Sequence, residues 1–280
     1  MSNKPKKSSA ARSIRTYLTL SFAAASFVAV LVFFGTGGVD EAEGAFQRTS
    51  IWFVITFIVS LVSIATFIRV QAKSKHPMLP LDLFKSRSIS IALGIALVTM
   101  SAFYGLVFMQ GLYFQQERGY SALVTGLLFL PMAATTPFTN GYVARVAARF
   151  GQTTPIIAGL LSMTFGLVAI ASLPSDVPIW VVSICMIFVG NGGAFTVPAI
   201  AALILEAAPA HLAGTASGVL NTFRQLGGSL GVAIFGAVAN ISAVFLAGLR
   251  TDYFVVAGIL ALAALLAFAY MRPGVNKPSA

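Results

Sequence analysis

The chain has 280 residues, of which 58% are hydrophobic and 9% are charged, and its mean hydropathy is +0.89. Such a chain has too little polar surface to coat a water-soluble globule, which indicates an integral membrane protein. Its net charge of +10 does not point to nucleic acid as a partner, because the basic residues gather in the connections between apolar segments.

The N-terminal region predicts a basic cytoplasmic tail at 1–16 and a two-helix membrane segment at 17–70, with spans at 17–35 and 51–68. The first apolar run is longer than the apolar region of a signal peptide, and no Ala-x-Ala-like cleavage site follows it. Residues 71–88 are basic and contain two prolines, so they are expected to form a cytoplasmic linker.

Six further apolar runs follow the linker, and each is continuous and long enough for a membrane-spanning helix. They are predicted near 89–114, 122–144, 153–173, 179–205, 215–244 and 253–271. The expected fold class is therefore all-α and integral to the membrane, with about eight transmembrane helices. Residues 89–272 would form a six-helix bundle, followed by a cytoplasmic tail at 273–280.

The distribution of basic residues predicts the orientation, because lysine and arginine are enriched in cytoplasmic connections. With the N-terminus inside, fourteen of the eighteen basic residues fall in inner segments. The expected outer loops hold Arg48, Arg118 and Arg250, together with six of the eight acids, among them Asp252. This pattern predicts a multi-pass protein of the plasma (inner) membrane with both termini in the cytoplasm.

Arg224 is the one charged residue that these boundaries place inside a span, between Asn221 and Gln225. A cation at the membrane centre costs at least about 2.5–3.5 kcal/mol, so Arg224 should face other helices or a wet cavity. These three residues are candidates for a substrate path or for gating. A purely structural role, with the arginine extended toward the cytoplasmic side, is the alternative.

Three other polar residues in the predicted spans are candidates for the same path: Gln110, Tyr113 and Asn191. Tyr113 is equally compatible with an interfacial aromatic anchor, and Asn191 with a hydrogen bond between helices. Two sets of glycines are expected to allow close helix packing. They are Gly190, Gly192 and Gly193 in one span and Gly227, Gly228 and Gly231 in another.

Five stretches occur in a characteristic order: HPMLPLDLFKSRS, LYFQQERGYSALVTGLLFLP, ARVAARFG, GNGGAFTVPA and GTASGVLNTFRQLGGSLGVAIFG. Together they resemble the fourteen-span drug:proton antiporter branch of the major facilitator superfamily (EmrB/QacA type). The resemblance covers about 15–272 and corresponds to the C-terminal part of a member: two central helices and the C-terminal six-helix bundle. It implies multidrug or other small-molecule efflux by an antiporter, with the lipid bilayer and a small-molecule substrate as partners.

Three departures from the family pattern bear on that expectation. The N-terminal bundle is absent, and no Asp or Glu falls within a predicted span. In the inter-helix loop motif Arg145, Arg149 and Gly151 remain, but Ala148 stands where the family has an aspartate. The chain is therefore expected to need a complementary bundle from a second chain, a homodimer or a missing upstream segment. The alternative is a transport-incompetent remnant or a membrane interaction protein that retains the half-fold.

Enzyme chemistry is not expected from this sequence. His76 and His211 lie far from any carboxylate pair or from cysteine with metal-ligand spacing, and Cys185 reads as a buried apolar residue. No catalytic residue, cofactor or metal site is predicted.

Overall fold

The computed structural model describes residues 86–241 and 245–271 and, before them, only the isolated residues 58, 59, 62, 66, 69 and 84. The chain divides into two units, Met1–Pro80 and Leu81–Ala280. The predicted N-terminal tail, the first span, nearly all of the second span and of the linker, and the C-terminal tail lie outside the described residues.

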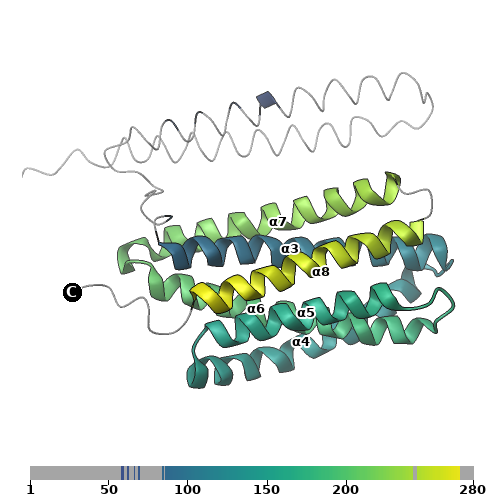
Figure 1. The fold of residues 1–280 in the computed structure, drawn as a ribbon, viewed down its shortest axis with the longest axis horizontal. Coiled ribbons are helices and arrows are strands. Elements are labelled where there is room, and N and C mark those ends of the chain that lie inside the picture. Colours follow the sequence, from purple (N-terminus) through teal and green to yellow (C-terminus); the bar gives the residue numbers. More distant parts are fainter. Residues whose placement is uncertain are drawn as a thin grey trace, which may run out of the picture. The chain divides into compact units, whose positions relative to one another are not determined.

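Six long helices make up the described part of this unit (Figure 1). Each corresponds to one of the six predicted spans, and the all-α fold class is confirmed. Their bounds are α3 (Arg87–Leu112), α4 (Ala122–Phe150), α5 (Thr153–Ser172), α6 (Ile179–Ala207), α7 (Ala213–Ile241) and α8 (Phe245–Tyr270). A π-helical turn, η2 (Tyr113–Glu117), continues α3, and a short 3-10 turn, η3 (Ala210–Leu212), precedes α7.

The connections end the helices for identifiable reasons. Gly119 and Gly151 have φ values of 68° and 81°, which lie in the left-handed region that glycine adopts without strain, and they end η2 and α4. Pro174 follows the end of α5 and Pro178 precedes the first residue of α6, so two prolines bracket the α5–α6 loop.

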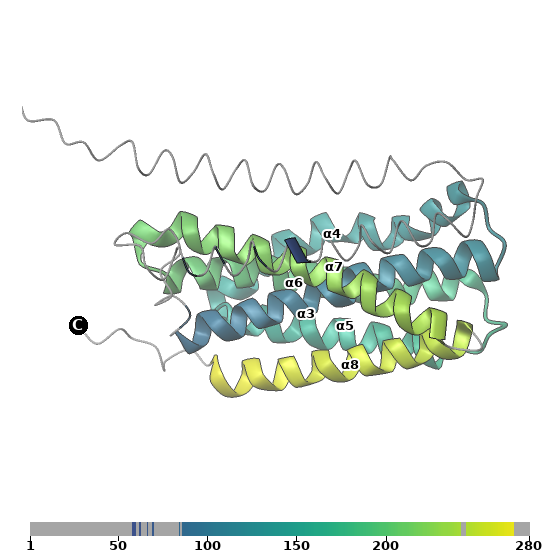
Figure 2. The same ribbon diagram turned by 90° about the horizontal axis from the view of Figure 1, so that it is seen from above.

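The helices form two layers. Helix α6 packs against α4 and α3, and α3 packs against α7, so α4, α6, α3 and α7 form a row in this order. Helices α5 and α8 pack on each other and on one face of that row, as the two perpendicular views show (Figures 1 and 2). The row therefore has one face covered by α5 and α8 and one face that they do not cover.

The core lies between these layers. Fully buried side chains from four helices meet there, among them Leu106, Leu160, Met186 and Leu260. Large apolar side chains also point outward, for example Phe138 on α4 and Leu265 on α8, which are 82% and 65% exposed. An apolar exterior around an apolar core is the expected pattern for a bundle surrounded by lipid.

Five of the six long helices are both long and apolar enough to cross a membrane, with α3 and η2 counted together. The exception among the described helices is α7, whose 29 residues suffice in length but include more polar side chains. The polar residues of α7 therefore have to be accommodated along the highly apolar α3, against which this helix packs.

Candidate functional site

Helix α7 has two exposed flanks of opposite character. Ser217, Asn221, Gln225 and Ser229 follow one another at four-residue spacing and are all exposed. Leu226, Leu230 and Ile234 form a second exposed row at the same spacing, with exposures near one half. At about 100° per residue the two rows lie on opposite sides of the face that packs on α3. We call them the polar row and the apolar row of α7.

Arg224 lies beside the polar row and is half-buried. Its Nε is buried and has no hydrogen-bond partner among the residues that the structure describes. A guanidinium group usually has its N–H groups paired when it leaves water, so this unpaired donor is an exception within the described bundle. Among the predicted path residues, Asn221, Arg224 and Gln225 thus lie together on one side of α7.

The packing face of α7 is a glycine seam against α3. A Cβ atom on Gly227 would lie 2.2 Å from the Leu97 carbonyl oxygen, and one on Gly231 would lie 2.3 Å from that of Ser101. At Gly228 it would meet the Tyr104 ring at 2.9 Å. The Ser101 hydroxyl also donates a 2.7 Å hydrogen bond to the Gly227 carbonyl. Backbone therefore touches backbone along this seam, which fixes the direction of the polar row.

The glycines of α6 lie against three different helices. A Cβ on Gly190 would meet Met132 of α4 at 2.3 Å, and one on Gly192 would meet Met163 of α5 at 2.2 Å. A Cβ on Gly193 would lie 3.7 Å from the Phe103 ring of α3, which is an ordinary contact distance. There is thus no space for a side chain at Gly190 or Gly192, whereas Gly193 has space for one.

Asn191 lies half-buried between α6 and α4, away from α7. The Thr139 hydroxyl donates a 2.7 Å hydrogen bond to its Oδ1. This contact joins two helices of the row. It is the hydrogen bond between helices that the sequence analysis gave as the alternative role of Asn191.

Gln110 and Tyr113 point into the bundle, not onto its surface. They are 1% and 7% exposed. The Tyr253 hydroxyl of α8 donates a 2.9 Å hydrogen bond to Gln110 Oε1, while Gln110 Nε2 is buried without a partner among the described residues. They lie at the end of the bundle that holds η2 and the α5–α6 loop, which we call the η2 end. The structure does not bring them together with the polar row of α7.

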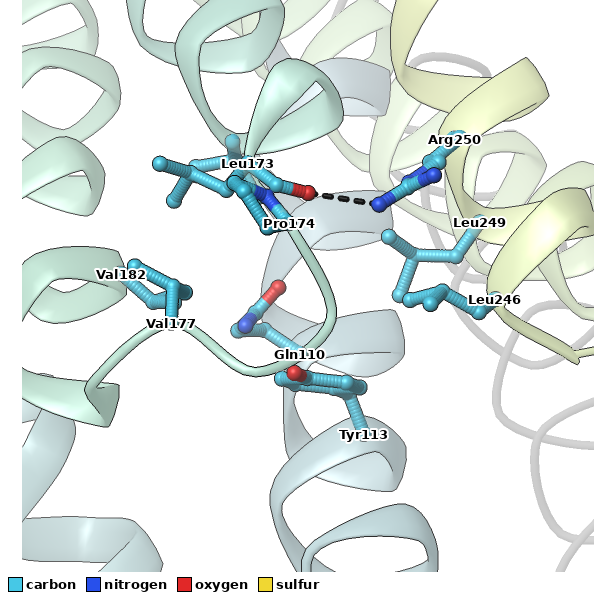
Figure 3. A pocket seen from close by; sticks show the side chains of 10 residues that line it. Gln110, Tyr113, Leu173, Pro174, Val177, Val182, Leu246, Leu249 and Arg250 are labelled. Atoms are coloured by element: carbon cyan, nitrogen blue, oxygen red, sulfur yellow. Dashed lines mark hydrogen bonds between the residues drawn. The ribbon is translucent and has the colours of Figure 1, made fainter.

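A small pocket opens at the η2 end (Figure 3), and its volume of about 20 Å³ leaves room for little more than one water molecule. Gln110 and Tyr113 line it from α3, and Leu249 and Arg250 line it from α8. Arg250 does not turn to solvent, because its Nη2 donates a 2.6 Å hydrogen bond to the Leu173 carbonyl at the end of α5.

A second arginine holds the same α5–α6 loop. Arg118 donates from Nη1 to the Ser175 carbonyl at 3.2 Å and from Nη2 to the Val177 carbonyl at 2.5 Å. Its guanidinium carbon also lies 5.7 Å from the centre of the Tyr113 ring. Two of the three arginines predicted in outer loops, Arg118 and Arg250, therefore bind backbone carbonyls of one loop.

The inter-helix loop motif lies at the opposite end of the bundle. Arg145 and Arg149 are exposed on the last turns of α4, and Arg149 lies 5.2 Å from the centre of the Phe150 ring. Gly151 ends the helix in a left-handed conformation, and its N–H donates to the Ala147 carbonyl at 2.8 Å. The left-handed conformation thus explains why glycine occupies position 151, while Arg145 and Arg149 are exposed.

Two predicted boundaries differ from the structure by more than one helical turn. Helix α4 ends at Phe150, six residues after the predicted end at 144, so Arg145 and Arg149 lie on the helix and not in a loop. The other boundary is the start of α8, where one candidate was missed. Helix α8 begins at Phe245, eight residues before the predicted start at 253. Asp252, expected in an outer loop, lies within α8 and is 5% exposed. The expectation that no Asp or Glu lies in a span is therefore wrong. The apolar run Ala243–Leu249 before Arg250 was the signal that could have extended the span.

No group of three or more metal-ligating side chains occurs in the described part of the chain. The arrangement instead offers a long amphipathic helix at the edge of an apolar bundle. Such a surface can line a path for a solute, provided that other helices cover it.

Residues 12–232 match the family model of the Major Facilitator Superfamily, which is more than half of the chain. The chain belongs to the major facilitator superfamily. Together with the apolar helices, this makes it a multi-pass membrane protein of a transporter family, not of an enzyme family.

Several facilitator relatives are resistance proteins. The multidrug resistance protein Stp of Mycobacterium tuberculosis is 30% identical over 193 residues, which is 68% of this chain and 35% of the relative. The methylenomycin A resistance protein of Bacillus subtilis is 30% identical over 220 residues, 78% of this chain and 47% of the relative. The tetracenomycin C resistance and export protein of Streptomyces glaucescens is 27% identical over 179 residues, 64% and 33% respectively. These matches span between one third and one half of the relatives' length.

Proposed function

We propose that this chain forms part of a drug-efflux antiporter of the fourteen-span type, in which α3–α8 are the C-terminal bundle. The polar row of α7 carries this proposal. In this assignment Asn221, Arg224 and Gln225 face the substrate path, while the apolar row faces lipid. An exposed row of amide and hydroxyl groups on a membrane helix costs free energy unless it meets water or polar partners.

The substrate class follows from the same residues and from the relatives. Asn221 and Gln225 can donate and accept hydrogen bonds, and the apolar surroundings suit the apolar part of a ligand. Small amphipathic compounds, such as the antibiotics that the relatives' names contain, fit such a surface. Direct ligand contact by Arg224 and a gating role for it are both compatible with its half-buried position.

A complementary bundle is part of this proposal, because the polar row has no cover among the described helices. A second chain, a second copy of this chain or a preceding segment could supply it. The length of the relatives supports this requirement, since the chain matches less than half of each.

We also propose that the protein lies in the plasma membrane with both termini in the cytoplasm. The exposed Arg145 and Arg149 would then lie inside and the η2 end outside. Arg118 and Arg250 are exceptions to the positive-inside pattern that the loop contacts explain, because both guanidinium groups are bound to carbonyls.

A second candidate function is a half-fold that does not transport but binds other membrane proteins. Ala148 favours it, because the motif has lost the acid that would pair with neighbouring cations. Under this alternative the polar row contacts a protein partner permanently, and no solute passes it.

The experiment that separates these functions measures efflux of a fluorescent cation from cells. The chain is expressed alone and together with the six-helix N-terminal bundle of a related transporter. We expect efflux only when the added bundle is present. It should be lost in the variants Asn221→Leu and Gln225→Leu and retained in the control Leu230→Val. Efflux by the chain alone would disprove the need for a partner. No efflux in either case, with the bundles bound to each other, would favour the interaction protein.

A further inference from the structure

Asp252 is the described acid that is most deeply buried, and the proposed efflux function does not use it. It lies two turns into α8 and is 5% exposed. Its Oδ2 has no hydrogen-bond partner among the described residues. The other acids of this part behave differently: Glu117 and Asp176 are exposed, and exposed Glu206 accepts a 2.9 Å hydrogen bond from Gln152.

The nearby charged and titratable groups on α8 are directed elsewhere. Arg250 donates to the Leu173 carbonyl, and Tyr253, next to Asp252, donates its hydroxyl proton to Gln110. Tyr253 also lies within electrostatic range of Asp252, and it is fully buried.

The three helices packed against α8 supply no counter-ion within their described parts. Helix α5 contains no ionisable residue, and α7 contains only Arg224, eleven residues and about 16 Å before Phe235, which contacts Tyr253. On α3 and η2 the titratable groups toward this end are Tyr104, Tyr113 and the exposed Glu117, none of which is a cation. Arg118 beyond them is bound to the α5–α6 loop.

A carboxylate in such surroundings has two ways to reach a favourable state. It can take up a proton and become neutral, or it can be reached by water. Isolated ionised groups are costly inside a bundle, and membrane-embedded acids often bind and release protons for this reason. The η2 end allows both states, because Asp252 lies near the end of the bundle where the α5–α6 loop closes over the helices.

We propose that Asp252 is a proton-binding residue that is protonated when the η2 end is closed and ionised when water enters there. On closing, an O–H bond forms between the carboxylate and a proton taken from water on that side. On opening, the proton returns to water and the carboxylate is restored. This inference rests on the proposed antiport function, to which it adds the residue that binds the proton.

The direct test is infrared spectroscopy of the full chain in lipid nanodiscs, titrated with pH and without any transport. We expect the carboxyl C=O band of a buried, protonated acid in the wild-type chain. It should be lost in Asp252→Asn and retained in the matched control Asp176→Asn, which removes an exposed acid from the same end. Asp252→Glu should keep a band at a shifted frequency, which identifies the residue even if Asp252→Asn does not fold.

A band that is absent from the wild-type chain, or unchanged in both Asp252 variants, would overturn the proposal. A transport measurement distinguishes failure of the proton-site proposal from failure of the proposed antiport function. With a complementary bundle present, proton-driven efflux should be lost in Asp252→Asn and retained in Asp176→Asn. If the wild-type chain shows the titrating band but never supports efflux, the antiport function fails while the proton site stands. If Asp252→Asn retains full proton-driven efflux, the coupling role of Asp252 fails.

Discussion

The hydroxyl of Tyr253 on α8 donates a 2.9 Å hydrogen bond to Oε1 of Gln110 on α3, and both side chains are almost completely buried. This bond joins the central helix of the row to the second layer at the η2 end. Gln110 uses only its acceptor here, since Nε2 has no partner among the described residues. The pair therefore adds one buried polar contact to the apolar packing between the two layers.

Replacing Tyr253 by Phe is expected to destabilise the bundle by about 1 kcal/mol, the usual scale for a hydrogen bond between membrane helices. The double variant Gln110→Leu, Tyr253→Phe should be more stable than the single Tyr253→Phe variant, because it leaves no buried amide unpaired. Thermal unfolding of the four proteins in detergent gives the double-mutant cycle. Additive effects would mean that the two side chains do not interact.

Substitution of Gly227 or Gly231 by Ala should separate α7 from α3. Each new methyl group would overlap a backbone carbonyl oxygen at 2.2–2.3 Å, and overpacking of this kind costs about 1–3 kcal/mol or more. Gly218→Ala on the same helix is the matched control, because a Cβ there meets nothing within 4 Å. Unfolding temperatures of the three variants check this. Equal stability of all three would contradict backbone contact at the seam.

Loss of the Arg118 guanidinium should loosen the α5–α6 loop. Its two nitrogens reach two carbonyls at once, which the single ammonium group of lysine does not reproduce. Arg118→Lys and Arg118→Gln are both expected to increase hydrogen exchange of the backbone amides at 175–177. Arg149→Gln, which removes an exposed arginine at the opposite end, should leave exchange there unchanged. Protection that survives both Arg118 variants would show that this arginine does not hold the loop.

The two flanks of α7 should differ in their contact with water. The chain has a single cysteine, so Cys185→Ser gives a background free of thiols. In that background Asn221→Cys and Gln225→Cys are expected to react with a water-soluble thiol reagent in membranes, while Leu226→Cys and Leu230→Cys should react far more slowly. A reversed order would place the polar row against lipid or protein and would contradict a substrate path there.

The arrangement of the helices could be predicted largely from apolar run lengths. The predicted spans 153–173 and 179–205 agree closely with α5 and α6, because Pro174, Pro178 and Pro209 mark their limits in the sequence. The start of α8 could not be predicted in the same way. Arg250 and Asp252 look like loop residues when each residue is scored alone, and their burial and contacts in the bundle depend on tertiary structure that no local pattern contains.

The candidate site was predictable in part for a similar reason. The sequence predicted Asn221, Arg224 and Gln225 in one span, and α7 forms as a helix over all three. The inward direction of Gln110 depends on Tyr253, which is 143 residues away in the sequence, and no local pattern contains that information. Side-chain directions that depend on partners distant in the sequence could therefore not be predicted.

The glycine contacts also have a mechanical consequence. At Gly227 and Gly231 against α3, and where Gly192 meets the Gly159 carbonyl of α5, neighbouring backbones approach each other without a layer of side chains between them. Helices in such contact cannot slide along one another by changing side-chain rotamers, because the atoms that touch belong to the main chain. Helices α7 and α3 should therefore move as one rigid pair, and so should α6 and α5. Any movement of the polar row would then carry α3 with it.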